Sequence, residues 1–398
     1  MALSKGSKPN FLFFSTVLFF VSNILNSSNA QNNINRDAFH IAITVDPKTH
    51  QYHGSFQSGT PSHNVNPLID LGGNFLSLPC NTSSSTLRSV PCKSTKCQNL
   101  KGVCDPKGAC TLSSGTLSDD IVTIHKTDGT MVYADTNSTR LDISCLNSNS
   151  RNNNGILGLG RTSNTLTNRL SSTFNIIPKF TLCLPSSNDN GFGDLFIGPG
   201  PYMFAGGVDG SSLLQFTGLV LSPTSNEYFV DVKSVKIDKR VVHFDSQTVI
   251  IGSTKLSTTV PYGILHSSVY KAVVGAFVKS TAARNITRAA AVKPFGACFS
   301  VEGVRWTKLG PRVPLIALEL SGRMGKLSWN INGANSMVRV DKNTLCLGFV
   351  DGGVKATTSI VLGGHQLKDN FLEFDLSRSV LGFSSSLQPG TCSNLRNF

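Results

Sequence analysis

The chain has 398 residues, of which 39% are apolar, and its formal net charge is +13. This length and apolar content are enough for about two domains with hydrophobic cores, which excludes a disordered or fibrous protein. The basic charge favours acidic partners, such as an acidic cell-wall polysaccharide or an acidic protein.

The first thirty residues have the pattern of a secretory signal peptide. Lys5 and Lys8 give a basic start, the apolar segment 11–25 follows, and a run of small residues ends at Ala30. A membrane span needs about 20 apolar residues, so this segment is too short for an anchor. We expect residues 1–30 to be removed and the rest to be secreted, which argues against a nucleic-acid partner.

The remainder predicts mostly β-strands. Short apolar or alternating runs are divided by clusters of Gly, Asn, Ser and Asp, which is typical of an all-β protein. One segment, 266–284, has its apolar residues at helical spacing, and Ser267 or Ser268 is the candidate N-cap. We assign this helix a structural role against a sheet.

The ten cysteines all follow the signal segment, and this even number predicts five disulfides in an oxidising compartment. Four of them crowd into residues 92–110, but no Cys-x-x-Cys pair and no His there supports a zinc site. Spacing alone leaves the pairing open. Sequons for N-glycosylation occur at Asn81, Asn137 and Asn285.

A weak internal repeat relates the two halves. In each half an apolar strand leads into a turn, and a strand of apolar residues ending in glycine follows much later. The matching segments are 68–76 with 155–161, and 254–265 with 359–367. Such a repeat predicts two related β-lobes, with Asp70 on one wall of a cleft and Ser257 on the other.

These segments resemble the pepsin-like aspartic proteases. More narrowly, "IDLGGNFL", "YFVDVKSVKI" and "SIVLGGHQLKDNFLEFDL" resemble the plant basic 7S globulin and xyloglucan-specific endoglucanase inhibitor group. The resemblance implies a mainly β, bilobal fold with a central cleft and a few short helices. We expect an N-terminal lobe over 31–205 and a C-terminal lobe over 206–398, with Cys392 tied back to the first lobe.

The catalytic chemistry of that family needs two carboxylates that share a proton. Each catalytic turn normally has the sequence Asp-Thr/Ser-Gly, but here residues 70–72 are Asp-Leu-Gly and residues 257–259 are Ser-Thr-Thr. The segment 110–124, where active members carry a Tyr over the cleft, has no Tyr and is short. We therefore predict that the chain is not an enzyme, because its dyad positions Asp70 and Ser257 are degenerate.

Other chemistries have less support. The nearby acids Asp119, Asp120 and Asp245 do not fall on a catalytic turn, and no Gly-x-Ser-x-Gly motif is present. The eight histidines are scattered, and we assign His365 a structural role. We predict no cofactor and no metal.

The resemblance also implies the disulfide pairing. The implied pairs are Cys80–Cys145, Cys92–Cys104, Cys97–Cys110, Cys183–Cys392 and Cys298–Cys346. The group usually has one pair more.

A scaffold without catalysis can still bind. The resemblance implies a secreted plant-defence inhibitor of microbial cell-wall-degrading glycosidases, in which a basic side chain blocks the acidic cleft of the enzyme. Segment 303–314 is our candidate, through Arg305, Lys308 and Arg312. Inhibitory members have Arg where this chain has Lys308, and a second Arg before the last cysteine is absent.

Two alternatives stay open. The chain could be a basic wall, storage or stress protein that binds peptide or acidic polysaccharide, or it could keep residual endopeptidase activity. In each case we expect a monomer in the apoplast and cell wall, with no membrane span.

Overall fold

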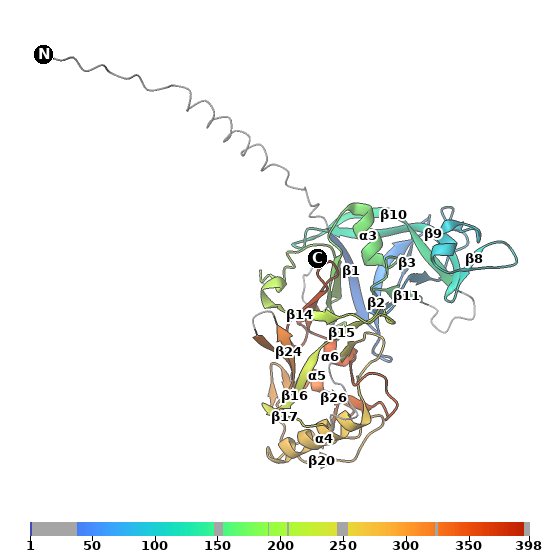
Figure 1. Ribbon diagram of the computed structural model, residues 1–398. Helices are drawn as coiled ribbons and strands as arrows, with labels where there is room; N and C mark the ends of the chain where they lie inside the picture. Colours follow the sequence, from blue (N-terminus) through green and yellow to red (C-terminus); the bar gives the residue numbers. More distant parts are fainter. Residues whose placement is uncertain are drawn as a thin grey trace. The chain divides into compact units, whose positions relative to one another are not determined.

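The computed structural model describes Met1 and residues 38–146, 154–189, 191–204, 207–244, 254–322 and 325–393. Apart from Met1, the predicted signal peptide lies outside these ranges, and so does Asp245. The fold is mainly β, as predicted. In Figure 1 the strands of the first half gather around α3 and those of the second half around α4. Within the described ranges, no helix combines the length and apolarity that crossing a bilayer requires.

The first half contributes β1 (Ala38–Val45), β2 (Tyr52–Ser58), β3 (His63–Val65), β4 (Leu68–Asp70), β5 (Leu76–Leu78), β6 (Arg88–Ser89), α2 (Thr95–Asn99), β7 (Val103–Cys104), β8 (Cys110–Leu112), β9 (Gly115–Thr127), β10 (Val132–Leu146), β11 (Ile156–Gly158), α3 (Leu166–Phe174), β12 (Lys179–Cys183) and β13 (Gly193–Ile197). Most are short, but β9 and β10 form a long antiparallel pair. Burial alternates along β2 and along much of β9, as expected for strands with one face on the core.

The second half contributes η1 (Gly210–Leu213), β14 (Gln215–Val220), β15 (Tyr228–Val230), β16 (Val232–Ile237), β17 (Arg240–Val241), β18 (Thr254–Leu256), β19 (Gly263–Leu265), α4 (Ser267–Ala282), β20 (Arg288–Ala289), β21 (Cys298–Ser300), β22 (Trp306–Thr307), β23 (Gly310–Pro311), β24 (Ile316–Gly322), β25 (Gly325–Ile331), α5 (Gly333–Ser336), β26 (Met337–Arg339), β27 (Thr344–Leu347), β28 (Phe349–Asp351), β29 (Ile360–Leu362), α6 (Gly364–Leu367), β30 (Phe371–Asp375), β31 (Val380–Phe383) and η2 (Thr391–Ser393).

The predicted helix is α4, but its predicted N-cap is wrong. The cap residue is His266, whose ring nitrogen Nδ1 accepts a hydrogen bond from the backbone N–H of Ser268 at 3.3 Å. An unprotonated imidazole nitrogen can fill the role that a serine oxygen usually has. The helix buries Val269, Val273 and Phe277, as its spacing predicts.

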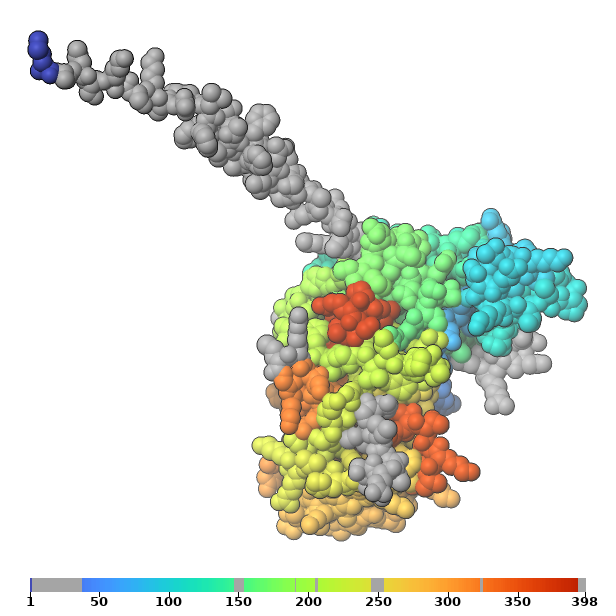
Figure 2. All heavy atoms as spheres, viewed as in Figure 1, coloured from blue at the N-terminus to red at the C-terminus, as the bar shows by residue number. Residues whose placement is uncertain are grey.

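The end of the chain returns to the first half. Strand β30 pairs with β12 and with β31, and β31 pairs with β14. One continuous run of strands therefore joins both halves. Lys179 on β12 places its ammonium 3.1 Å from the Glu373 carboxylate of β30. Figure 2 shows red atoms of the C-terminal segment lying against green atoms from the middle of the chain.

The disulfides fasten loops to this framework. The structure contains Cys80–Cys145, Cys92–Cys104, Cys97–Cys110, Cys183–Cys392 and Cys298–Cys346, with no free cysteine among the described residues. These are the pairs that the resemblance implies.

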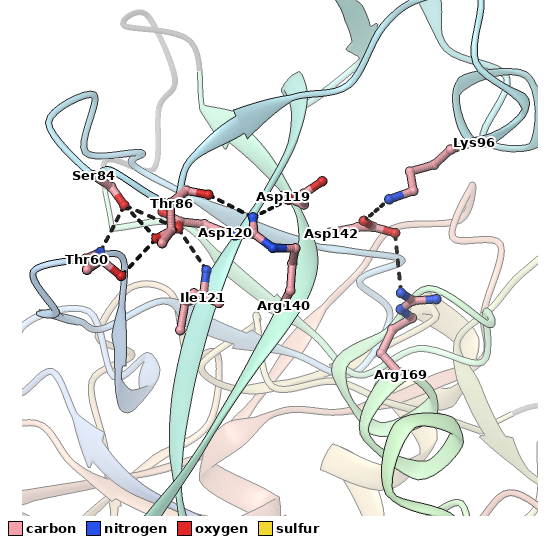
Figure 3. Close-up of polar contacts among 10 residues, drawn as sticks. All are labelled: Thr60, Ser84, Thr86, Lys96, Asp119, Asp120, Ile121, Arg140, Asp142 and Arg169. Carbon is pink, nitrogen blue, oxygen red and sulfur yellow. Dashed lines mark hydrogen bonds and ion pairs between the residues drawn. The ribbon is translucent and has the colours of Figure 1, made fainter.

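An ion-pair group also holds the cysteine loop in place. Lys96 of α2 and Arg169 of α3 both contact the carboxylate of Asp142 on β10, at 2.6 and 3.6 Å (Figure 3). Because Asp142 is largely buried, this contact connects three elements of the first lobe around one charge.

Candidate functional site

The first predicted turn follows β4, which lies parallel to β11 with Asp70 opposite Gly158. The Asp70 carboxylate accepts a hydrogen bond from the Gly72 N–H at 2.8 Å, and the Gly73 N–H donates to the Asp70 carbonyl at 3.1 Å. A Cβ on Gly73 would lie 2.7 Å from the Gly158 Cα, so the close approach of turn and strand requires glycine. Leu71 is buried in the core at 1% exposure.

The second turn follows β18, which lies parallel to β29. The Ser257 N–H donates to the Leu362 carbonyl at 3.0 Å, and the Ser257 hydroxyl lies 3.1 Å from that of Thr259. The buried Thr258 side chain reaches the other turn. Its hydroxyl donates to the Ile69 carbonyl at 2.6 Å and accepts from the Leu71 N–H at 3.2 Å. The structure thus brings the turn of Asp70 and the turn of Ser257 into contact through Thr258.

Two charged residues that the sequence analysis missed lie beside Asp70. Glu227 forms an ion pair with Lys255, and the Glu227 side chain lies against Gly72. Burial raises the pKa of Asp70, and the Glu227 charge raises it further, whereas the Gly72 N–H and Lys255 oppose the shift. Strands β15 and β18 pair with Phe229 opposite Lys255, which places Glu227 and Lys255 together.

The hairpin beside this site is short, as predicted. Leu112 of β8 pairs with Gly115 of β9, so Ser113 and Ser114 form a two-residue turn. A hollow of about 840 Å³ extends from Asp70 to this hairpin and to the cysteine loop. It has the size of a ligand site.

The other acids of this region have structural partners (Figure 3). The Asp120 carboxylate accepts hydrogen bonds from the hydroxyls of Thr86 at 2.6 Å and Ser84 at 3.2 Å. Asp119 forms an ion pair with Arg140. These contacts connect the loop before β6 to β9 and β10, so we assign both acids to the framework.

The predicted basic segment forms the β22–β23 hairpin. Thr307 pairs with Gly310, so Lys308 and Leu309 form its turn. Arg305, Lys308 and Arg312 are all exposed. The two arginines flank the base of the hairpin, where they share a hollow of about 310 Å³ with Arg284, while Lys308 lies at the tip.

The remaining predicted residues are distributed over the surface and core. Asn285 is exposed, and Asn81 and Asn137 are partly exposed. Burial holds the pKa of His365 well below its usual value, and its Nε2 lies 3.0 Å from the Met337 carbonyl. No group of three or more His, Cys, Asp or Glu side chains within the described parts of the chain could hold a metal.

Comparison with known families identifies this arrangement. The "Xylanase inhibitor N-terminal" model matches residues 52–199, and the "Xylanase inhibitor C-terminal" model matches residues 227–385. The chain belongs to this family of pepsin-like proteins. It is 38% identical to the "Probable aspartic proteinase GIP2" of Nicotiana benthamiana, over 89% of this chain and 90% of that protein.

Solved structures of the family share the fold. The crystal structure of "edgp" has a TM-score of 0.80 and 36% identity, and it covers 90% of this chain and 98% of its own. The basic 7S globulin from soybean has a TM-score of 0.77 and 28% identity, with 91% and 98% covered. The predicted fold class and family are therefore confirmed. The boundary between residues 205 and 206 stays a prediction.

Proposed function

We propose that this protein is a secreted, proteolytically inactive member of its family that inhibits a microbial cell-wall-degrading glycosidase, such as an endoglucanase or xyloglucanase. The observation that carries the proposal is the exposed β22–β23 hairpin with Lys308 at its turn. The family's description as a xylanase inhibitor supports this class of partner.

The hairpin is held in one conformation before any partner arrives. The Arg312 N–H donates to the Arg305 carbonyl at 2.8 Å, and the Ala334 N–H donates to the Leu309 carbonyl at 3.0 Å. A Cβ on Gly310 would lie 2.4 Å from the Ala334 nitrogen, so the hairpin packs tightly on α5. A fixed hairpin loses less entropy on binding than a mobile loop.

The charge at the hairpin suits a glycosidase cleft. Such a cleft contains a pair of carboxylates on either side of the scissile bond. An ammonium group inserted between them makes charge-assisted hydrogen bonds and excludes the sugar. Lysine contacts one carboxylate as a point charge, whereas arginine can bind it through two parallel hydrogen bonds. We therefore expect weaker inhibition than an arginine at position 308 would give.

The absence of proteolysis is part of the proposal. Ser257 has a hydroxyl where the mechanism needs a second acid, and that hydroxyl cannot share a proton with Asp70 at a working pH. Glu227 is the nearest substitute, but its carboxylate is paired with Lys255 and with the Ser225 hydroxyl at 3.1 Å.

A second candidate function is binding of acidic cell-wall polysaccharide. The hollow formed by Arg284, Arg305 and Arg312 favours it, because guanidinium groups bind carboxylates in fixed geometry. Only Arg284 has a carboxylate partner in the part of the chain that the structure describes, through Asp238 at 2.6 Å.

The test uses the secreted full-length protein against a panel of microbial endoglucanases, xyloglucanases and xylanases. We expect one of them to lose activity at micromolar protein, and the Lys308→Glu variant to inhibit at least about tenfold less. Lys107→Glu, an equal charge change at an exposed position of the other lobe, should inhibit normally.

Three outcomes would contradict parts of the proposal. No inhibition across the panel removes the inhibitor function, and salt-reversible retention on pectin would then favour polysaccharide binding. If Lys308→Glu inhibits as well as the unmodified protein does, the β22–β23 hairpin is not the element that binds the enzyme. Peptide cleavage in acid that a transition-state inhibitor of aspartic proteases blocks would show an active enzyme.

A further inference from the structure

A third hollow lies apart from the Asp70 turn, between the start of β2 and the C-terminal lobe. Its volume is about 320 Å³. His50 and Tyr52 line it from the first lobe, and Tyr262, Trp306, His365 and Lys368 line it from the second. This volume is at the lower end for small-molecule sites, so it suits a ligand of about one ring.

One side of this hollow is aromatic. The Tyr262 ring lies 6.0 Å from the His50 ring and 6.0 Å from the His365 ring, measured between centroids. Phe295 packs edge-on against Tyr262 at 4.7 Å and supports it. Trp306 is 53% exposed, which is unusual for so large an apolar ring and leaves its surface open to a ligand.

The polar side carries positive charge. The Lys368 side chain lines the hollow and is partly buried, and within the described residues its ammonium makes no ion pair or hydrogen bond. The Arg339 guanidinium lies 5.9 Å from the centroid of the Trp306 ring. No Asp or Glu is among the residues that line the hollow.

The nearest acid to Lys368 is engaged elsewhere. Asp369 accepts a hydrogen bond from the Cys392 N–H at 3.1 Å. Burial lowers the pKa of Lys368, and the Asp369 charge only partly opposes this shift. Partial burial of a cation without a partner is unfavourable, so an anion beside it would be stabilised.

We propose that this hollow binds a small organic acid that carries one aromatic ring. The carboxylate would contact the Lys368 ammonium, and the ring would pack against Tyr262 and Trp306. Aromatic contact supplies apolar area, and the single cation selects an anion over a neutral molecule of the same shape. The hollow borders the β22–β23 hairpin through Trp306, but this proposal does not rest on glycosidase inhibition.

The experiment is calorimetric titration of the full-length secreted protein with phenylacetate and benzoate, and with benzamide as the neutral counterpart of benzoate. We expect saturable binding of the two acids and at least about tenfold weaker binding of benzamide. Lys368→Met keeps the apolar stem and should weaken binding of the acids to the same degree. Lys107→Met, at an exposed position of the other lobe, should bind as the unmodified protein does.

Trp306 gives a second readout. The other tryptophan, Trp329, is buried and stacked on Phe383, so a ligand in this hollow should change the fluorescence of Trp306 alone. Trp306→Ala should weaken binding of phenylacetate and remove the fluorescence change. It also keeps the test informative if Lys368→Met fails to fold.

The proposal is wrong if neither acid binds saturably, if benzamide binds as well as benzoate, or if both folded variants bind normally. Inhibition of a glycosidase is measured separately, with sugar substrate and without aromatic acid. If no glycosidase is inhibited, the proposal of an aromatic-acid site still stands. If no aromatic acid binds, the proposed inhibitor function still stands.

Discussion

The two turns at the centre of the molecule carry different side chains. The first has a carboxylate at Asp70, followed by the apolar Leu71. The second has hydroxyls at Ser257 and Thr258. Between the two turns, the Thr258 hydroxyl donates a hydrogen bond to the Ile69 carbonyl and accepts one from the Leu71 N–H.

The backbone packing of the two turns is more alike than their side chains. Both turns keep the glycine at their supporting strand. A Cβ on Gly158 would lie 2.6 Å from the Gly73 carbonyl oxygen, and one on Gly363 would lie 2.5 Å from the Tyr262 carbonyl oxygen. The glycines that let backbone pack on backbone are present in both lobes, whereas the side chains on the two turns differ.

The largest expected effect comes from those supporting glycines. Gly158→Ala and Gly363→Ala should each lower the free energy of unfolding by about 3 kcal/mol or more, because a methyl group has no space against two backbone oxygens. Urea unfolding of the two variants checks this.

Gly275→Ala is the matched control. Gly275 lies within α4, and a Cβ there would contact nothing within 4 Å. The same change should stabilise the protein by about 1 kcal/mol, because alanine favours the helix. If either supporting glycine tolerates alanine as well as Gly275 does, the two turns do not share this packing requirement.

A smaller effect is expected from the hydroxyl that joins the turns. Thr258→Val keeps the shape but leaves the Ile69 carbonyl and the Leu71 N–H without their partner. Because both groups are buried, the free energy of unfolding should fall by about 1–3 kcal/mol. Thr259→Val removes a hydroxyl that only contacts Ser257, and it should cost less. If Thr258→Val and Thr259→Val lose equal stability in urea unfolding, the hydrogen bonds between Thr258 and the first turn contribute no more than the contact between Thr259 and Ser257.

The sequence predicted the backbone of this site better than its charges. The motifs around Asp70 and Gly363 predicted both turns and both supporting strands, because a glycine beside an apolar run indicates that backbone packs closely on backbone. Glu227 lies outside the repeated segments, and Lys255 lies inside segment 254–265 without being one of the turn residues on which the prediction was based. They lie together only through the pairing of β15 with β18, and strand register is set by the whole sheet.

The sequence also did not predict the hollow that Tyr262 and Lys368 line, or the residue that caps α4. Residues such as His50 and Lys368 are far apart in the chain, and only the contact between lobes places them around one space. The cap at His266 was missed because a histidine nitrogen is a rare substitute for a serine oxygen. The family resemblance implied the disulfide pairs, which spacing alone left open.

The smallest expected effect is a pH dependence that only the first turn has. The folded-state pKa of Asp70 is raised, mainly by burial and then by Glu227. For an acid with a raised pKa, stability is highest below the unfolded-state pKa and falls as the pH rises through the folded-state value. Asparagine does not titrate and can still accept the Gly72 hydrogen bond. Relative to the unmodified protein, Asp70→Asn should therefore gain stability as the pH rises from acid to neutral.

Asp128 gives a control of opposite sign. Burial is the largest single influence and raises its pKa, but the hydrogen bonds from Thr130, Tyr133 and the Met131 N–H together outweigh it and hold the pKa well below its usual value. Its contribution is present above the unfolded-state pKa and is lost as the pH falls, so Asp128→Asn should cost stability at neutral pH and less in acid. Urea unfolding of both variants at several pH values measures the two slopes. The contrary result is that the stability of Asp70→Asn changes with pH in the same direction as that of Asp128→Asn. The first turn would then stabilise the charged form of the Asp70 carboxylate, as a catalytic turn does.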